Sequence, residues 1–571
     1  MEILDWIVLS VTLSFIVIYG ILKTKGSANV KDYLLDNNET PWFTVGVSVM
    51  ATQASAITFL STPGQAYHDG MGFVQFYFGL PLAMIVIAYT FIPIYHRLKV
   101  YTAYEYLEQR FNVQTRTLAA ILFLIQRGLG TGITIYAPSI ILSALLGWNL
   151  NMLNIIIGIL VIVYTVTGGT KAVNVTQKQQ MFVIMSGMFI IFFYILANLP
   201  HEVDFSNVLH IAGANGKMDI LDFSYNPETR YTFWSGITGG FFLMLSYFGT
   251  DQSQVGRYLS GKSIKESQMG LIMNGILKVP MQFFILLTGV LVFVFFQFND
   301  APLHFNPTNV EKVKTSEYKA DYENLEQKLS QINTDKKIVN QIYIEQLKHN
   351  EYDNPILKKQ MVALSLKEKD LREEAKTVIA KVDGKTETND KDYVFLYFIL
   401  NYLPKGILGL LLAVIFSAAM SSSASGLNSL AATSAIDIYK RNVNAKSDKH
   451  YVYATQYFTI FWGIVAIGFA CISSLFENLI QLVNIIGSIF YGTVLGIFLI
   501  GFYINYIKGK AVFIGACISQ LTIFYIFYLD IVGYLWLNFI GALLTIGLSL
   551  ILQKFFNKSN LTSPKKSIQI Y

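Results

Sequence analysis

Long apolar segments recur along most of the 571-residue chain. A helix needs about 20 apolar residues to cross the hydrocarbon core of a bilayer. By this measure we expect thirteen spans, near residues 4–22, 42–63, 72–95, 117–146, 150–169, 178–199, 232–254, 268–297, 405–436, 452–474, 478–506, 511–529 and 532–553. Hydrophobic residues make up 53% of the chain and charged residues only 14%, which excludes an ordinary soluble domain. We therefore predict an all-α, polytopic membrane protein.

Lysine and arginine residues gather in alternate loops between these segments. Lys23, Lys25 and Lys31 follow the first segment, and Lys554 and Lys558 follow the last. Because such loops usually face the cytoplasm, we expect the N-terminus outside and the C-terminus inside. The net charge of +6 is then a mark of topology, not of nucleic-acid binding. We expect a multi-pass protein of a cell membrane, the bacterial plasma membrane in particular.

The familiar motifs of enzymes and cofactor sites are missing from the sequence. Its seven histidines are scattered without an HExxH pair, and no GxSxG, Walker or GxGxxG motif stands between a strand and a helix. Cys471 and Cys517 lie in separate apolar segments, which indicates neither a disulfide framework nor a metal cluster. We therefore expect no enzyme, no organic cofactor and no evident protein partner.

Residues 299–392 interrupt the apolar pattern with a charged segment. Stretches such as EYKADYENLEQKLSQ mix both signs of charge, and Glu and Lys at i, i+4 spacing favour solvated helices. The alternation of the loops places this insert outside the membrane. We predict a helical hairpin over the outer mouth, and a mobile elaboration without function is the alternative.

Residues 415–429, IFSAAMSSSASGLNS, place six serines and an asparagine within an apolar span. Positions i, i+3 and i+4 share one face of a helix, so the carbonyl of Ala418 and the hydroxyls of Ser421 and Ser422 can converge. Neutral oxygens of this kind can replace the hydration shell of a monovalent cation. Close packing of helices through small residues is the alternative that this segment alone leaves open.

Two apolar segments contain residues that interrupt a helix at its middle. The segment at 42–63 has Gln53, Ser55 and Thr58 near its centre, and Pro63 follows. The later segment FWSGITGGFFLMLSYFGTDQ contains several glycines. Paired broken helices indicate an inverted repeat, and their free carbonyls bind coupling ions in many transporters. Close packing through glycine is again the alternative.

The chain resembles the sodium/solute symporter family, which includes sodium-coupled sugar, proline, sialate, monocarboxylate, multivitamin and iodide transporters. The stretches that carry the resemblance are YTVTGGTKAVNVTQKQQ, YFGTDQSQVGRYLSGKSIKES, ILKVPMQFFILLTG and GLLLAVIFSAAMSSSASGLNSLAATSAIDIYKR. It implies a LeuT-like inverted-repeat fold in a single transporter domain. An extra N-terminal helix at 4–22 would precede repeats at 42–199 and 232–506, and two C-terminal helices would occupy 507–555. It also implies sodium-coupled symport by alternating access, with Na⁺ as coupling ion.

The resemblance also implies a sodium site. Its ligands would be the carbonyls of Ala51 and Ala54 on the first broken helix, with the Ala418 carbonyl and the Ser421 and Ser422 hydroxyls opposite.

A second sodium site of some family members has an aspartate where this chain has Gln177. A supporting hydroxyl of that site is replaced here by Ala424. Both departures predict one sodium per transport cycle.

The resemblance is less specific about the solute. Sugar carriers bind hydroxyls with a glutamate and a glutamine, at positions where this chain has Tyr77 and Thr58. Losing such partners weakens polyol binding. The stretches ASAITFLSTPGQAYHDG and GTGITIYAPSIILSALLG are similar to the monocarboxylate, multivitamin and iodide carriers, whose substrates are anions. We therefore favour an organic anion, with sugar as the alternative and a transporter-like sensor as the rival from another class.

The candidate residues of the solute site are polar or aromatic positions on the expected core helices. They are Gln53, Thr58, Gln75, Phe76, Tyr77, Met244, Tyr247, Lys278 and Asn484. Lys278 matches a lysine of some sugar carriers, or it is satisfied by carbonyls or by Asp251. Arg127, about ten residues inside its span, could attract an anion, replace the charge missing near Gln177, or extend to the cytoplasmic interface.

Overall fold

The computed structural model describes residues 3–23, 30–349, 354–383, 388–443, 446–472 and 479–562, and its regular elements in these ranges are helices. The α-helices are α1 (Ile3–Lys23), α2 (Val30–Leu35), α3 (Trp42–Gln53), α4 (Ala56–Asp69), α5 (Leu80–Val86), α6 (Ile92–Leu98), α7 (Ala103–Arg110), α8 (Val113–Leu146), α9 (Leu150–Ala197), α10 (Phe205–Ala214), α11 (Phe241–Thr250), α12 (Gln252–Leu259), α13 (Ile264–Phe298), α14 (Pro307–Lys314), α15 (Lys319–Lys348), α16 (Pro355–Asp383), α17 (Lys391–Tyr402), α18 (Ile407–Thr433), α19 (Lys440–Asn442), α20 (Asp448–Ile472), α21 (Leu479–Tyr503), α22 (Gly509–Leu529) and α23 (Tyr534–Thr562). Shorter 3₁₀ or π turns are η1 (Asp36–Asn38), η2 (Gly70–Tyr77), η3 (Ile87–Phe91), η4 (Ser235–Gly240) and η5 (Ser434–Tyr439). The all-α prediction is therefore confirmed.

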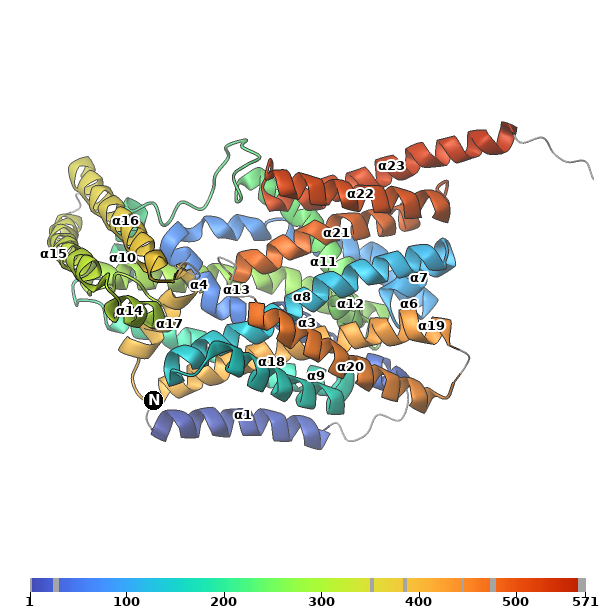
Figure 1. Ribbon diagram of the computed structural model, residues 1–571, viewed down its shortest axis with the longest axis horizontal. Coiled ribbons are helices and arrows are strands. Elements are labelled where there is room, and N and C mark those ends of the chain that lie inside the picture. Colours follow the sequence, from blue (N-terminus) through green and yellow to red (C-terminus); the bar gives the residue numbers. More distant parts are fainter. Residues whose placement is uncertain are drawn as a thin grey trace, which may run out of the picture.

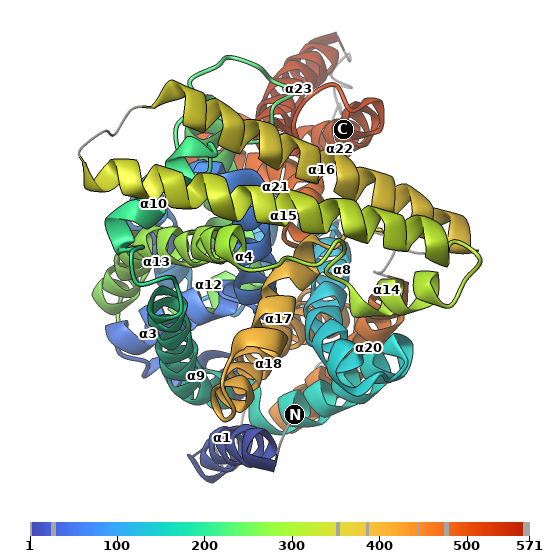
Figure 2. The ribbon, with the colours of Figure 1, turned by 90° about the vertical axis from the view of Figure 1, so that its left-hand side faces the viewer.

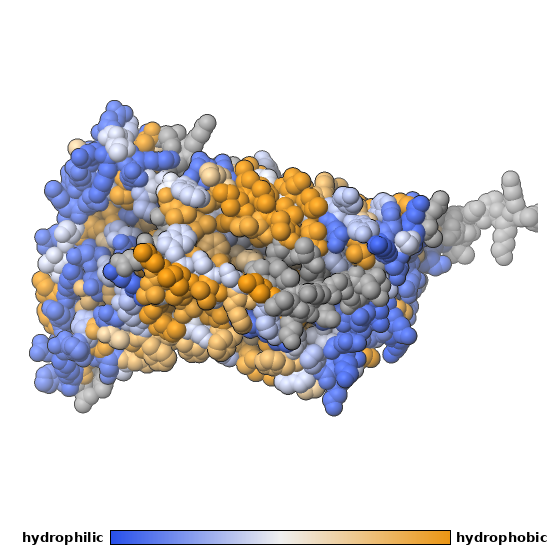
Figure 3. Space-filling view, turned by 90° about the horizontal axis from the view of Figure 1, so that it is seen from below, coloured by the Kyte–Doolittle hydropathy of each residue, from blue (hydrophilic) through white to orange (hydrophobic). Residues whose placement is uncertain are grey.

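Most of the long helices run roughly along one axis of the molecule (Figure 1). Apolar side chains cover much of the middle of the visible surface, and hydrophilic side chains gather at both ends (Figure 3). This distribution matches a bilayer core between two aqueous layers.

Nine helical segments in the described ranges are long and apolar enough to cross a membrane. They are Ala56–Leu98, Val113–Ser143, Val173–Ala197, Ile264–Phe298, Ile407–Asn442, Asp448–Ile472, Leu479–Tyr503, Gly509–Leu529 and Tyr534–Asn557. Two shorter apolar helices, Ile3–Ile16 and Leu150–Val163, add to these. The expected spans at 150–169 and 178–199 both lie in α9, which the structure shows as one helix from Leu150 to Ala197. The count of thirteen spans and the orientation stay predictions.

The expected span at 42–63 is divided into α3 and α4. Between them Ala54 has φ −82° and ψ 75°, and Ser55 is extended. The Ser55 amide donates to the carbonyl of Gln53, and the Thr58 amide donates to the carbonyl of Ser55. In an uninterrupted helix these two amides would have filled the carbonyls of Ala51 and Ala54. The break therefore leaves backbone oxygen atoms available inside the bundle.

The later glycine-rich span is also divided, although near its end and not at Gly236, Gly239 and Gly240, which lie in the π turn η4. Its helix α11 ends at Thr250, and α12 begins at Gln252. Asp251 between them is extended, and its side chain accepts a hydrogen bond from the amide of Ser253. Both segments that the sequence marked as interrupted are therefore broken helices.

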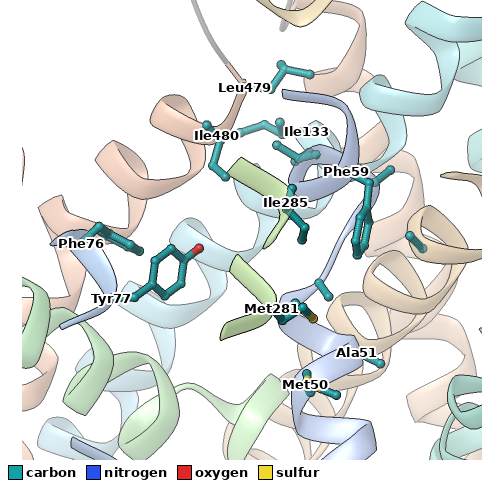
Figure 4. Packing of buried hydrophobic residues seen from close by; sticks show 14 of the residues in the cluster. Met50, Ala51, Phe59, Phe76, Tyr77, Ile133, Met281, Ile285, Leu479 and Ile480 are labelled. Atoms are coloured by element: carbon teal, nitrogen blue, oxygen red, sulfur yellow. The ribbon is translucent and has the colours of Figure 1, made fainter. Parts of the chain in front are cut away.

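Helix α13 packs along the first broken helix, and its close approach depends on small residues. Gly46 and Gly270 face each other between α3 and α13, and a Cβ on Gly289 would overlap Pro63 of α4. Figure 4 shows Met281 of α13 next to Met50 and Ala51. The break in α3 and α4 is therefore enclosed by protein on this side.

The charged insert forms a long hairpin of α15 and α16, which crosses one end of the bundle (Figure 2). A small core of its own holds the hairpin to α14 and to the chain before it, and consists of Leu303, Val313, Tyr322, Leu325, Leu329, Leu371, Ala375 and Ile379. Helix α17 then packs against α4, where a Cβ on Gly64 would overlap the carbonyl oxygen of Lys391. The Lys391 ammonium also lies 3.0 Å from a carboxylate oxygen of Asp69 at the end of α4.

Three buried charges link the two helices of the hairpin. Lys336 of α15 lies 2.7 Å from Glu368 of α16, and Arg372 lies 2.9 Å from the other oxygen of Glu368. Arg372 also donates to the carbonyl of Leu303 at 3.0 Å. Burial alone would raise the pKa of Glu368, but Lys336 and Arg372 lower it to about 2. The carboxylate is therefore charged at neutral pH, and its stabilising effect is lost only as the pH falls toward 2.

We expect the substitution Glu368→Gln to loosen the hairpin by about 3–5 kcal/mol, because it leaves two buried cations without a counter-charge. Hydrogen exchange of α15 and α16 in the purified protein measures this change. The matched control is Glu326→Gln, whose carboxylate is 35% exposed and pairs with the exposed Lys314, so it should cost about 0–1 kcal/mol. Equal exchange in the two variants would contradict a stabilising role for the buried charges.

Candidate functional site

A cavity of about 100 Å³ lies beside the break between α3 and α4. Side chains from the two halves of the broken helix, from η2 and from α8, α11, α18 and α21 line it. They are Thr52, Gln53, Ser55, Ile57, Thr58, Phe76, Tyr77, Gln126, Arg127, Gly130, Thr131, Thr134, Leu243, Met244, Tyr247, Ser422, Ile480, Val483, Asn484 and Tyr491. Among these lining residues Arg127 is the one with a charged side chain.

The structure brings seven of the nine candidate solute residues to this cavity, namely Gln53, Thr58, Phe76, Tyr77, Met244, Tyr247 and Asn484. Figure 4 shows the side chains of Phe76 and Tyr77 next to each other on η2. The mixture of aromatic and apolar walls with a few polar groups is typical of a small-molecule site.

Gln75 and Lys278 do not line the cavity. The Gln75 amide donates to the carbonyl of Tyr231 at 3.2 Å and accepts from the amide of Asp222 at 3.0 Å, so it secures a loop. Lys278 is fully buried in α13, and within the described residues its Nζ has no hydrogen-bond partner. Asp251, the partner considered for it, pairs with Arg127 instead.

Arg127 of α8 forms an ion pair with Asp251 at the break between α11 and α12. The other oxygen of Asp251 accepts from the amide of Ser253 at 2.9 Å and from its hydroxyl at 2.6 Å. Tyr491 donates to Asp251 at 2.9 Å, and the Arg127 guanidinium lies 5.4 Å from the ring centroid of Tyr247. Arg127 is thus held at the cavity wall, and it does not extend to the cytoplasmic interface.

The pairing of Arg127 with Asp251 was missed in the sequence. The two residues lie 124 positions apart, and no local spacing connects them. A signal was present nevertheless: Asp251 is an acidic residue within the second interrupted span, and a buried charge needs a partner.

Helix α18 presents its serines to the end of α3. The Ser422 hydroxyl donates to the carbonyl of Thr52 at 3.3 Å, and Ser425 lies 3.2 Å from the Thr52 hydroxyl. These contacts set α18 against the turn of α3 that carries Ala51. Ala51, Ala54, Ala418, Ser421 and Ser422 are all buried.

Gln177 of α9 lies behind these serines, within a network of uncharged side chains. Its amide nitrogen lies 2.9 Å from the Ser421 hydroxyl, 3.1 Å from that of Ser425 and 3.2 Å from that of Thr52. Its amide oxygen accepts from Ser48 at 2.5 Å. The i, i+4 spacings of Ser48 with Thr52 and of Ser421 with Ser425 could have indicated this network. Ala424, also buried, supplies no hydroxyl.

The polar residues around the α18 serines differ from a conventional metal site, which is built from His, Cys, Asp or Glu side chains. Among the described residues, no group of three or more His, Cys, Asp or Glu side chains converges as metal ligands would. The polar atoms near the serines are amides, hydroxyls and backbone carbonyls, which suit a hard monovalent cation better than a transition metal.

Comparison with known proteins identifies the family. The chain is 25% identical over 514 residues to the sodium-coupled monocarboxylate transporter 1 of Xenopus laevis, which covers 90% of this chain and 70% of that protein. It is 31% identical over 273 residues to the sodium/iodide cotransporter of Homo sapiens, which covers 48% of this chain and only 42% of that protein.

A solved structure of a Na⁺-coupled sialic acid symporter in a substrate-bound, outward-open state aligns with a TM-score of 0.74 at 23% identity. The alignment covers 97% of this chain and 98% of that chain, so the LeuT-like fold is shared. The sequence model of the family described as "Sodium:solute symporter family" matches residues 33–329 and 373–519, and leaves out most of the hairpin of the insert. The chain therefore belongs to the sodium:solute symporter family.

Proposed function

We propose that this protein couples the inward movement of one Na⁺ to the uptake of a small organic anion by alternating access. The observation that carries the proposal is the meeting of the α18 serines with the broken end of α3 in a member of a sodium symporter family.

The proposed sodium ligands are the carbonyl oxygens of Ala51, Ala54 and Ala418 and the hydroxyls of Ser421 and Ser422. The amides that would bond Ala51 and Ala54 in a continuous helix belong to Ser55 and Thr58, and both bond elsewhere. Unfilled carbonyls inside a protein are costly, and a cation satisfies them. All five ligands are neutral, so the charge of the ion makes its departure depend on the membrane potential.

One sodium per cycle is supported by the position of Gln177. Its amide nitrogen occupies the space between Ser421 and Ser425, and it donates hydrogen bonds there. A second cation at this place would have to displace the Gln177 amide from Ser425 and Thr52, and it would gain from a carboxylate, which Gln177 lacks. Ala424 removes one more oxygen from the same region.

An organic anion as solute is supported by the electrostatics of the cavity. Arg127 lies on its wall and pairs through one nitrogen with Asp251, which is outside the lining, and the buried Nε of Arg127 has no hydrogen-bond partner among the described residues. A carboxylate in the cavity could therefore use the guanidinium without meeting an acidic wall. The relatives named above are carriers of monocarboxylates and of iodide, and both of these substrates are anions. Sugar is less favoured, since Tyr77 and Thr58 stand at the aligned positions and Lys278 lies outside the cavity.

The proposal includes a place and an orientation in the cell. The protein lies in a bacterial plasma membrane as one transporter domain, with its N-terminus and the insert outside and its C-terminus in the cytoplasm. The family and the apolar helices support a multi-pass membrane protein, and the basic loops support this direction.

In proteoliposomes, we expect an inward Na⁺ gradient to drive uptake of a labelled monocarboxylate, with one Na⁺ entering per solute. Lactate, pyruvate and benzoate are suitable anions, and glucose is the neutral comparison. Uptake and ²²Na⁺ entry measured together give the ratio.

Potassium and choline gradients serve as controls for the driving ion. Uptake that ignores sodium would refute the symport proposal, and two sodium ions per solute would refute the role given to Gln177. Preferential uptake of glucose would replace the anion by a sugar.

A further inference from the structure

A second cavity, of about 400 Å³, lies between the insert and the end of the bundle. The end of α4, the loop after α10, α13, α16 and the start of α17 contribute its walls. The lining residues are Tyr67, His68, Asp69, Asn215, Lys217, Phe293, Val362, Ser365, Leu366, Glu368, Lys369, Arg372, Glu373, Lys376, Asp390 and Lys391. Figure 2 shows α15 and α16 above this end of the bundle, over α4 and α17. Much of the wall thus comes from the segment that the family match leaves out.

The acidic residues of this cavity are already satisfied within the protein. Their partners are Lys336 and Arg372 for Glu368, Lys376 at 2.8 Å for Glu373, Lys391 at 3.0 Å for Asp69, and the Phe305 amide at 2.8 Å for Asp390. Because each carboxylate on the wall already has a partner, none of them is left to bind an added cation.

Two lysines of the wall form no close ion pair among the described residues, although Asp69 and Glu368 act on Lys217 from a distance. Lys369 of α16 is exposed beside the cavity, and it forms no ion pair there. Lys217 donates to the carbonyl of His68 at 2.5 Å, and its Nζ lies 4.8 Å from the ring centroid of Phe293. Burial lowers the pKa of Lys217 to about 8, so it still carries its charge at pH 7. The charge left over on the wall is positive.

An apolar surface adjoins the two lysines. Tyr67 and Phe293 contribute rings that meet edge to face with centroids 5.7 Å apart, and Val362 and Leu366 of α16 lie in the same lining. Val362 is 41% exposed and Leu366 54% exposed, so both side chains are accessible to a ligand. The cavity wall therefore carries two ammonium groups for a charged group and an apolar surface for a short hydrocarbon part.

We propose that this cavity is a binding site for a small organic carboxylate on the outer face of the protein, separate from the central cavity. Lys217 and Lys369 hold the carboxylate, and the rings of Tyr67 and Phe293 contact its apolar part. The inference rests on the ion pairs and packing of the insert, and the identity of the transported solute does not enter it. The ligand could be the transported solute or another external carboxylate of the same chemistry.

The test uses benzoate as probe and benzamide as its neutral isostere, with binding to the purified full-length protein measured by calorimetry. The background variant is Arg127→Gln with Asp251→Asn, which removes the central guanidinium without leaving its partner unpaired. In this background we expect benzoate still to bind, and benzamide to bind at least about tenfold more weakly, because a charge-assisted contact is lost.

The double substitution Lys217→Gln and Lys369→Gln in the same background should weaken benzoate at least about tenfold. Arginine at both positions should restore binding, and Lys337→Gln, a lysine of α15 that pairs with Asp300 away from the cavity, should leave it unchanged. If the two lysine substitutions in an otherwise wild-type protein also raise the KM of uptake, the ligand of the outer cavity is the transported solute. An unchanged KM indicates a separate carboxylate.

Three results would overturn the proposal: no benzoate binding in the background variant, equal binding of benzamide, or unchanged benzoate binding after both lysines are replaced. The first result would assign anion binding to the central cavity alone, so the proposed function would survive it. A failure of sodium-driven uptake would, in turn, leave the binding measurements at the outer cavity untouched.

Discussion

Ser422→Ala and Ser421→Ala should each raise the sodium concentration for half-maximal uptake at least about tenfold, since each removes one of five proposed ligand oxygens. We expect these substitutions to affect sodium binding much more than folding. Among the described residues, the Ser422 hydroxyl bonds the carbonyl of Thr52, and Ser421 shares the amide of Gln177 with two other hydroxyls. Each variant should therefore fold and reach the membrane. Uptake at graded sodium concentrations in proteoliposomes measures the effect.

Ser423→Ala is the matched control on the same helix. Its hydroxyl lies 2.8 Å from that of Thr134, so it faces α8 and takes no part in the proposed site. Its sodium dependence should stay within a factor of about two of wild type, since an ordinary hydrogen bond contributes little net free energy. The assignment of the sodium site fails if both Ser421→Ala and Ser422→Ala keep the wild-type sodium dependence, or if Ser423→Ala shifts it as strongly.

Arg127→Gln should lower anion uptake by at least about a hundredfold, because it removes the charge on the cavity wall and strands Asp251. The stranded carboxylate should also cost about 3–5 kcal/mol of stability. Two effects are thus mixed in this variant, and thermal unfolding together with uptake is needed to separate them.

The double variant Arg127→Gln and Asp251→Asn separates them. Removing both charges should restore most of the stability while anion uptake stays low. Arg127→Lys keeps the charge but loses the planar, two-pronged geometry, so intermediate uptake is expected. Near-normal anion uptake in the double variant would show that Arg127 serves folding alone, and the solute class would need another explanation.

The sequence was informative where a function depends on local order along the chain. The break at Gln53 to Thr58 follows from polar residues inside an apolar segment. The face shared by Ala418, Ser421 and Ser422 follows from helical spacing. Apolar length indicated the membrane helices, and the family resemblance indicated the fold.

The structure was needed to tell in which direction a side chain points and which residues far apart in the sequence pair with each other. Gln75, Phe76 and Tyr77 are neighbours, but in η2 the first turns to a loop and the other two face the cavity. Helix α13 is buried around most of its middle, so no polar face tells where Lys278 points. The partner of Arg127 comes from a break on another helix.

The close contact of α4 with α17 gives the insert a mechanical relation to the sodium site. Since no side chain fits at Gly64, the backbones of the two helices lie in direct contact there. Helix α4 begins at the break that would hold the ion and ends beside Lys391. Ile57 and Thr58 near its start line the central cavity, and Tyr67, His68 and Asp69 at its end line the outer cavity. A movement of α4 at the break would thus change the walls of both cavities together.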